Sequence, residues 1–257
     1  GGDAPGTITR AGGGTVELAP WRSVTLGPGD TLAVGALASD ATGYLACFPP
    51  PNVPVVQGAR GTMLRAQFGG HEGRVLAAGD TLPLCDARLD GGECAAVPPE
   101  RGEAVLRVIP GPQADHFDET AMATFTGEPF TVTDNADRMG VRLAGPRIAH
   151  NEKGADIMSE GLAPGAVQVP GEGQPIVLGV DAQTIGGYPK IATVITADLP
   201  RLAQLRPGQT WRFLAVTFDE ARAALEAAET TLAMAIAGIV PAAPLGGLDT
   251  EALHRVN

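Results

Sequence analysis

The sequence predicts an all-β protein of barrels or sandwiches followed by one helix, and three observations support that class. The 35 glycines and 22 prolines fall at intervals between short β-branched runs, a pattern typical of strands joined by turns. A turn-like heptapeptide recurs three times, and only one long stretch has helical character. With 257 residues, 44% of them hydrophobic, the chain can bury a core in one large or two small domains.

The recurring heptapeptides are LGPGDTL (26–32), LAAGDTL (76–82) and LRPGQTW (205–211). In each, a Gly precedes Asp or Gln, then Thr and an apolar residue follow. Glycine accepts an unusual φ and threonine favours the start of a strand. We therefore expect each copy to lead the chain into an equivalent strand, in related β units on both sides of a boundary.

The segment 86–103, DARLDGGECAAVPPERGE, is the predicted boundary, because it is rich in Gly, Pro and charge and has no periodicity. A new strand is expected to start at residues 104–109. The predicted domains are residues 1–103 with the linker, residues 104–218, and a C-terminal helix and tail over 219–257.

Three strands of a meander are predicted at 167–169, 176–180 and 191–195, with a tight turn at 171–173 between the first two. The loop before the third strand, DAQTIGGYPK (181–190), contains a Gly-Gly pair that can take positive φ and a proline that fixes the backbone. This loop is predicted to have a defined shape.

A helix is predicted from Asp219, as N-cap, to about Ala237, where Gly238 can end it. Leu225, Leu232 and Ile236 recur at near-helical spacing and form an apolar stripe. The stripe either covers a barrel end or makes a contact between subunits.

Composition excludes several classes of function. A net charge of −11, with only 18 Lys and Arg, argues against nucleic-acid binding. The longest apolar run, 231–240, is too short for a bilayer span. Three cysteines without CxxC spacing suit neither a disulfide framework nor a zinc site and are typical of the cytoplasm. An aromatic content of 4% leaves few stacking platforms for a carbohydrate- or lipid-binding barrel.

Common catalytic motifs are absent from the sequence, which contains no GxSxG, no GxxxxGK[ST] and no HExxH. The four histidines have no short-range pairing, so no metal is predicted. The candidate site is instead the polar set around the loop, where amides and a phenol can orient a small polar substrate and a lysine can bind an anionic oxygen. The alternative is that these groups only satisfy turns and buried backbone. The substrate-binding candidates are Gln168, Gln174, Asp181, Gln183, Thr184, Gly186, Gly187, Tyr188, Arg142 and His150.

Lys190, Glu160 and Arg138 are the catalytic candidates. Glu160 could act as a general base if burial raises its pKa. Arg138 and Arg142 would share one face of a strand and form an anion clamp, or would pair with Asp137 and a nearby acid. A structural role is the alternative for His150, and also for His71, a second-rank candidate.

Three long motifs in order resemble one known family. They are DRMGVRLAGP (137–146), SEGLAPGAVQVP (159–170) and GQPIVLGVDAQTIGGYPKIATVI (173–195). They look like the second-subunit family of allophanate hydrolase, which includes KipI-antagonist proteins, the C subunit of 5-oxoprolinase and part of the carboxyltransferase domain of urea carboxylase. The similarity runs from FGGHEGRVLAAGDTLPL (68–84) to WRFLAV (211–216).

The resemblance implies two cyclophilin-like β-barrels, and we expect the first to lack strands here, with the family's N-terminal segment missing and a premature end at Asn257. It implies a subunit of a heteromeric enzyme with a KipI-like first subunit as partner. The implied chemistry is ATP-dependent opening of 5-oxoproline to glutamate, or transfer of a carboxyl group from carboxybiotin to urea. In both, Lys190 and an arginine would stabilise oxyanion charge. The alternative is a non-catalytic regulator that binds a KipI-like inhibitor of a histidine kinase.

Overall fold

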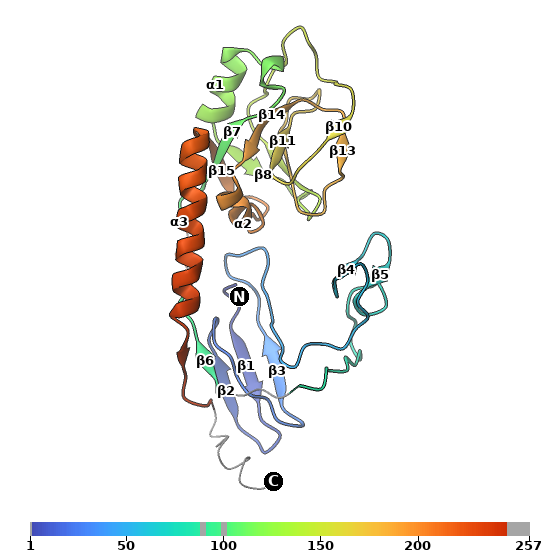
Figure 1. The fold of residues 1–257 in the computed structure, drawn as a ribbon, viewed down its shortest axis with the longest axis vertical. Helices are drawn as coiled ribbons and strands as arrows, with labels where there is room; N and C mark the ends of the chain where they lie inside the picture. The colour runs from blue at the N-terminus through green and yellow to red at the C-terminus, as the bar shows by residue number, and fades with distance from the viewer. Residues whose placement is uncertain (1, 88–90, 99–101, 246–257) are drawn as a thin grey trace.

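The computed structural model describes residues 2–87, 91–98 and 102–245, and it confirms the mostly-β class. A small N-terminal sheet and a closed barrel lie one beyond the other, and a long helix runs beside the barrel toward the sheet (Figure 1). Within those residues, no helix combines the length and the apolar character that a bilayer span requires.

The N-terminal unit is built on a three-stranded antiparallel sheet in the order β2-β1-β3. Its strands are Gly6–Thr9 (β1), Thr15–Leu18 (β2) and Thr31–Val34 (β3). A hairpin of two short strands, Thr62–Met63 (β4) and Phe68–Gly69 (β5), lies to one side of this sheet. Ile8 is fully buried, whereas most other large apolar side chains of this unit remain exposed. The main core therefore belongs to the barrel.

The barrel closes through seven strands in the order β11-β12-β9-β8-β15-β7-β14, and all neighbours are antiparallel except β7 and β15. Closure removes exposed strand edges. The strands are Val105–Pro110 (β7), Phe130–Val132 (β8), Gly140–Ala144 (β9), Ala166–Gln168 (β11), Ile176–Leu178 (β12), Lys190–Val194 (β14) and Thr210–Ala215 (β15).

Alternating side chains of these strands fill the barrel, as period-2 geometry requires. Leu106 and Val108 of β7, for example, are buried. A helix that the sequence analysis missed, Glu119–Gly127 (α1), adds Phe125, whose ring lies 4.4 Å from that of Phe213 between centroids. The Asp118 side chain accepts a hydrogen bond from the Ala121 N–H and caps α1.

The predicted meander is present. Strands β11, β12 and β14 correspond to the expected strands at 167–169, 176–180 and 191–195, and each boundary agrees within about two residues. The Gly173 N–H donates to the Pro170 carbonyl at 2.8 Å, which closes the predicted turn. The second strand ends before Val180, which is exposed.

The three heptapeptides form the same turn. Gly29, Gly79 and Gly208 all have positive φ. The next side chain, Asp30, Asp80 or Gln209, accepts from the backbone N–H three residues earlier at 2.9, 2.6 and 3.0 Å. Strands β3 and β15 follow the first and third copies, as predicted, whereas the second leads only to an isolated bridge at Leu84.

The C-terminal helix spans Phe218–Ala237 (α3), and its N-cap is Thr217 rather than the predicted Asp219. Thr217 and Glu220 form a capping box, which satisfies more backbone donors than Asp219 could. Gly238 is the C-cap, as expected. No α3 residue is buried, and Leu232 and Ile236 are 61% and 60% exposed. Leu225, near the barrel end of the helix, is partly buried, so the stripe covers the barrel at its first residue but not at Leu232 and Ile236.

The chain after α3 returns to the N-terminal unit. Val240–Pro241 (β16) pairs with Cys94–Ala95 (β6), a strand inside the segment predicted to be a linker. Beyond β16, the buried Glu93 accepts from the Leu245 N–H at 2.9 Å. Arg10 and Arg22 donate to the carbonyls of Leu245 and Ala243. We call this set, Arg10, Arg22 and Glu93 around 240–245, the tail clamp.

The remaining short elements lie around the barrel, where one of them helps to join the two units. The Gln204 amide, just after α2, bonds both the N–H and the carbonyl of Thr42, at 2.9 and 3.1 Å. Arg206 donates to the Ala38 carbonyl at 2.7 Å. The short elements are Ala114–His116 (η1), Glu160–Gly161 (β10), Ile185–Gly186 (β13), Thr196–Asp198 (η2) and Leu199–Leu202 (α2).

Candidate functional site

Two polar side chains from neighbouring barrel strands form the centre of the candidate site. Gln168 of β11 lies opposite Lys190 of β14, next to a shift in register. Opposite residues on antiparallel strands project to the same face. Val167 and Val169 belong to the core, so Gln168 between them projects away from it. Both side chains are nonetheless buried, with Gln168 2% and Lys190 4% exposed.

The Lys190 ammonium is held by an acid from another strand pair. Its Nζ donates to Glu160 Oε1. The same oxygen accepts from Gln113 Nε2 at 2.6 Å. Gln113 is tied back to β14, because its Oε1 accepts from the Lys190 N–H and its own N–H donates to the Lys190 carbonyl, both at 3.3 Å. We call Gln113, Glu160, Gln168 and Lys190 the polar cluster.

The environment of Glu160 does not meet the condition set for a general-base role, which was a pKa raised by burial. The hydrogen bond from Lys190, and then that from Gln113, lowers the pKa of the Glu160 carboxyl below its usual value of 4.5. Its side chain is 44% exposed, and the upward effect of partial burial on the pKa is outweighed by these hydrogen bonds. The expectation of a raised pKa is wrong, and Glu160 is a permanent counter-ion to Lys190 near neutral pH.

The glycine-rich loop covers Gln168. Strand β13 pairs with β10 so that Gly186 lies opposite Glu160. A Cβ on Gly186 would lie 2.7 Å from Leu162 Cδ1 and 3.0 Å from Gln168 Nε2, so any larger residue would require these two side chains to shift. Gln168 Nε2 donates weakly to the Tyr188 carbonyl at 3.5 Å. The loop thus brings the predicted Gly186, Tyr188 and Lys190 together with Gln168 and Glu160.

Arg138 and Asp181 form a separate pair. Arg138 Nε and Nη2 donate to Asp181 Oδ2 and Oδ1 at 2.6 and 3.1 Å. This bond lowers the pKa of Asp181 and raises that of Arg138. Arg138 precedes β9 whereas Arg142 lies within it and is exposed, and among the described residues Arg138 is the one of the two predicted arginines with a carboxylate partner, Asp181. Asp137 instead accepts from the Met139 and Gly140 N–H groups.

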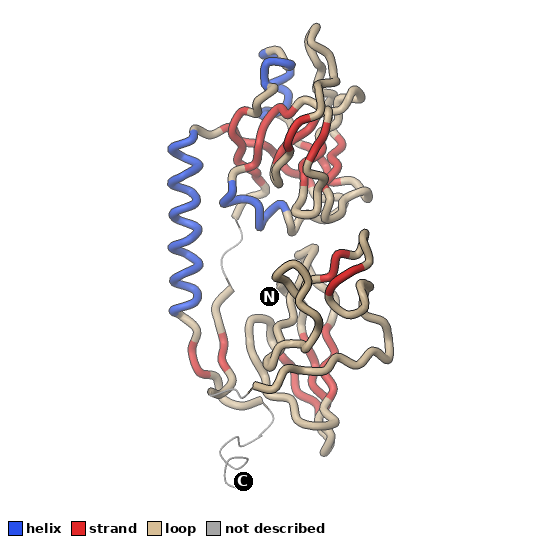
Figure 2. The backbone as a smooth tube through the Cα atoms, turned by 45° about the vertical axis from the view of Figure 1, so that its right-hand side comes forward, coloured by secondary structure: helices blue, strands red, loops and turns tan. Residues whose placement is uncertain are grey.

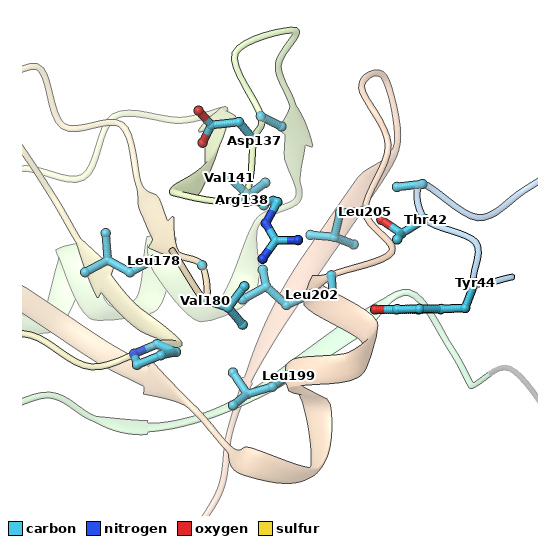
Figure 3. A pocket seen from close by; sticks show the side chains of 15 residues that line it. Thr42, Tyr44, Asp137, Arg138, Val141, Leu178, Val180, Leu199, Leu202 and Leu205 are labelled. Carbon is cyan, nitrogen blue, oxygen red and sulfur yellow. The ribbon is translucent and has the colours of Figure 1, made fainter. Parts of the chain in front are cut away.

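Arg138 lines a cavity of about 300 Å³ between the barrel and the loop that contains Thr42 and Tyr44 (Figure 3). No member of the polar cluster lines this cavity. The structure therefore divides the predicted catalytic residues between two places, with Lys190 and Glu160 in one and Arg138 in the other.

The other predicted residues have structural partners or exposed positions. Gln174 exchanges hydrogen bonds with the Gly145 backbone at 2.8 and 3.1 Å. His150 Nε2 bonds the Val169 carbonyl at 2.8 Å, and its ring packs on Phe117. His71 lies near Asp80 in the N-terminal unit. Gln183 and Thr184 are exposed, and the Gly187 carbonyl accepts from the Ile157 N–H at 2.8 Å.

Gln113 is the member of the polar cluster that the sequence analysis missed. It follows β7 in the sequence IPGPQ, and η1 begins just after it. A Gly-Pro turn directly after a buried strand was the available signal. The contact with Lys190, 77 positions later, could not be read from spacing.

The described residues contain no group of three or more His, Cys, Asp or Glu side chains placed to hold a metal ion. The three cysteines form no disulfide.

Comparisons of this chain with known proteins agree on one family. A family model described as carboxyltransferase domain, subdomain A and B, matches residues 1–215. The C subunit of 5-oxoprolinase from Escherichia coli (strain K12) is 41% identical over 178 residues, which are 69% of this chain and 57% of that protein. Urea amidolyase of Saccharomyces cerevisiae is 28% identical over 236 residues, 84% of this chain and 13% of that protein.

The crystal structure of Kluyveromyces lactis urea carboxylase has the same fold, with a TM-score of 0.74 over 90% of this chain and 22% of that one, at 24% identity. The chain spans only 57% of the Escherichia coli relative. The family match covers the N-terminal sheet and the whole barrel and stops where α3 is about to begin. The chain therefore belongs to the family of carboxyltransferase domains, subdomains A and B.

Proposed function

We propose that this chain is part of a heteromeric enzyme of the 5-oxoprolinase type, which opens the lactam 5-oxoproline to glutamate. The observation that supports it best is the buried pair of Lys190 and Gln168 on one barrel face, in a chain 41% identical to the C subunit of a 5-oxoprolinase. An ammonium and an amide side by side offer the donors and the acceptor that an amide group needs.

Lys190 would act on the carbonyl oxygen of the substrate. Attack on a lactam carbonyl builds negative charge on that oxygen, and a fixed ammonium stabilises the charge without reorganising. Lys190 Nζ has three donors, and Glu160 takes one of them. Because Lys190 is only 4% exposed, little water competes for the rest.

Gln168 and Glu160 would position the reacting groups. Gln168 Nε2 is directed to the Tyr188 carbonyl, so its Oε1 is left to accept from the lactam N–H. Glu160, whose lowered pKa favours the carboxylate, orients the Lys190 side chain through their hydrogen bond. We assign Glu160 a positioning role, and the half-exposed side of its carboxylate is where a small substrate would enter.

Neither ATP nor carboxybiotin is assigned a step in this chain. Among the catalytic candidates, Lys190 pairs with Glu160 and Arg138 pairs with Asp181, and the sequence contains no GxxxxGK[ST] motif that would bind a triphosphate. A KipI-like first subunit would supply what is missing, as the family implies. We place this complex in the cytoplasm, where Cys47, Cys85 and Cys94 would stay reduced.

The test is turnover by the complex. The full-length parent protein is co-expressed with its first-subunit protein, and ATP-dependent formation of glutamate from 5-oxoproline is measured, with carboxylation of urea assayed in parallel. Glutamate formation is expected. Carboxylation of urea without glutamate formation would show that urea, and not 5-oxoproline, is the substrate. A stable complex inactive in both assays would favour the alternative of a regulator that binds a KipI-like protein.

A further inference from the structure

The cavity beside Arg138 is separate from the polar cluster and has its own construction. One wall is the loop with Ala41, Thr42 and Tyr44 from the N-terminal unit, and the other walls come from the barrel and α2 (Figure 3). Its volume of about 300 Å³ lies at the small end of the range for ligand pockets.

The loop wall is fixed by directed hydrogen bonds. Gln204 bonds both backbone groups of Thr42, and Arg206 donates to the Ala38 carbonyl. On the other side, the Asp3 carboxylate accepts from the Ala38 and Ser39 N–H groups at 3.0 and 2.7 Å. The wall is therefore held in place from both units, which keeps the cavity open.

The floor of the cavity is apolar and well packed. Leu178, Leu202, Leu205 and Val141 line it and are themselves between 2% and 6% exposed. Only one face of each is left to the cavity. Such a surface binds apolar groups because it releases poorly bonded water.

One cation, Arg138, lies at the edge of this apolar space, where its side chain is 75% exposed to solvent. The Arg138 guanidinium lies among Val180, Leu202 and Leu205 (Figure 3). Asp181 takes Nε and Nη2, which leaves Nη1 without a hydrogen-bond partner among the described residues. Asp137, the other charged group of the lining, is turned away and bonds backbone N–H groups. The cavity thus offers an apolar floor and one charged donor.

We propose that this cavity is a second binding site, independent of the polar cluster, for a small molecule with an apolar ring or chain and one acceptor group, a carbonyl, carboxylate or sulfonate. The apolar body would lie on Leu178, Leu202 and Leu205. The acceptor would bond Arg138 Nη1.

Two fluorescent probes with the same rings test the proposal. 1-Anilinonaphthalene-8-sulfonate carries an acceptor, and N-phenyl-1-naphthylamine does not. The full chain should bind one sulfonate dye saturably. Val180→Trp, at a 67% exposed position on the rim, should fill the cavity and abolish binding of both probes. Arg138→Gln should weaken the sulfonate dye about tenfold and leave the neutral dye unchanged.

Matched variants distinguish a guanidinium that binds the dye from an ion pair that only supports the fold. Asp181→Asn breaks the ion pair but keeps the guanidinium, so it should retain the sulfonate dye; equal weakening by Asp181→Asn and Arg138→Gln would show that the pair acts only structurally. Met234→Lys, on the exposed face of α3, should change nothing. Loss of dye in Met234→Lys, or unchanged binding in a folded Val180→Trp protein, would overturn the proposal.

Discussion

Gln168 and Lys190 occupy directly opposite positions on β11 and β14, and both are almost fully enclosed although one is charged. A barrel strand could place apolar residues at both positions without any cost of desolvation. Burying a charge is costly unless it is paired and hydrogen-bonded, and here Glu160 meets that need from a separate two-stranded sheet, β10 with β13. This arrangement motivates the first two predictions.

Lys190→Ala is expected to lower glutamate formation by the complex at least tenfold, because the charge that faces the developing oxyanion is removed. Lys153→Ala is the matched control, since Lys153 is half-exposed and pairs with Asp115 at the surface. It should keep activity within about twofold. A Lys190→Ala complex that assembles normally and turns over within about threefold of wild type would refute the assignment.

Glu160→Gln is expected to lower the melting temperature near neutral pH, and the deficit should shrink in acid. The folded pKa of Glu160 lies below 4.5, so its contribution to stability is present above that pH and is lost as the pH falls through the folded pKa. Thermal unfolding of both proteins across the acidic range measures the difference. Glu172→Gln, in the exposed turn after β11, should show no such pH dependence.

Gly208→Ala is expected to destabilise the barrel by about 1 kcal/mol, because a left-handed φ of 84° is unfavourable for alanine. No atom lies within 4 Å of the added Cβ, so the effect comes from the backbone alone. Gly127→Ala, equally open but in the last turn of α1, should be neutral or stabilising. Equal urea midpoints for the two variants would contradict this account of the repeated turn.

Glu93→Ala is expected to loosen the tail clamp. It leaves the N–H groups of Thr25 and Leu245 without their acceptor, at a cost of about 2 kcal/mol. Limited proteolysis should then cut between α3 and residue 245 faster than in wild type. Glu17→Ala, on the exposed face of β2, is the control. Unchanged cleavage would mean that β16 alone holds the tail.

Local patterns in the sequence were sufficient to predict the barrel meander. Short β-branched runs around 167, 177 and 192 each became a strand, because a short, almost continuously buried apolar run bounded by turn residues is typical of a buried strand. The recurring turn was also predictable, since Gly before Asp or Gln encodes its own geometry. Helix α1 was missed because its mixture of Ala, Thr and Met gives a weak apolar stripe.

Long-range partners were beyond reach of sequence reasoning. Arg138 could be expected to meet an acid, but nothing in the spacing selects Asp181 over Asp137. The pairing of β6 with β16 joins two strands of two residues each, from distant parts of the chain. Lys190 and Gln168 were identified as candidates from the loop and its flanking strands, whereas the acid that binds Lys190 depends on the pairing of β10 with β13, two strands distant in the sequence.

Helix α3 starts at the barrel and ends where β16 joins the N-terminal unit (Figure 2). Its 20 residues amount to a rod of about 30 Å. Helix α3 and the Gln204–Thr42 contact connect the barrel to the N-terminal unit at two separate points. The distance between the two units therefore depends on the number of turns in α3. Removing one turn would shorten the rod by about 5.4 Å and shear the loop that forms one wall of the cavity. The size of that cavity therefore depends on the length of α3, although α3 buries none of its own residues.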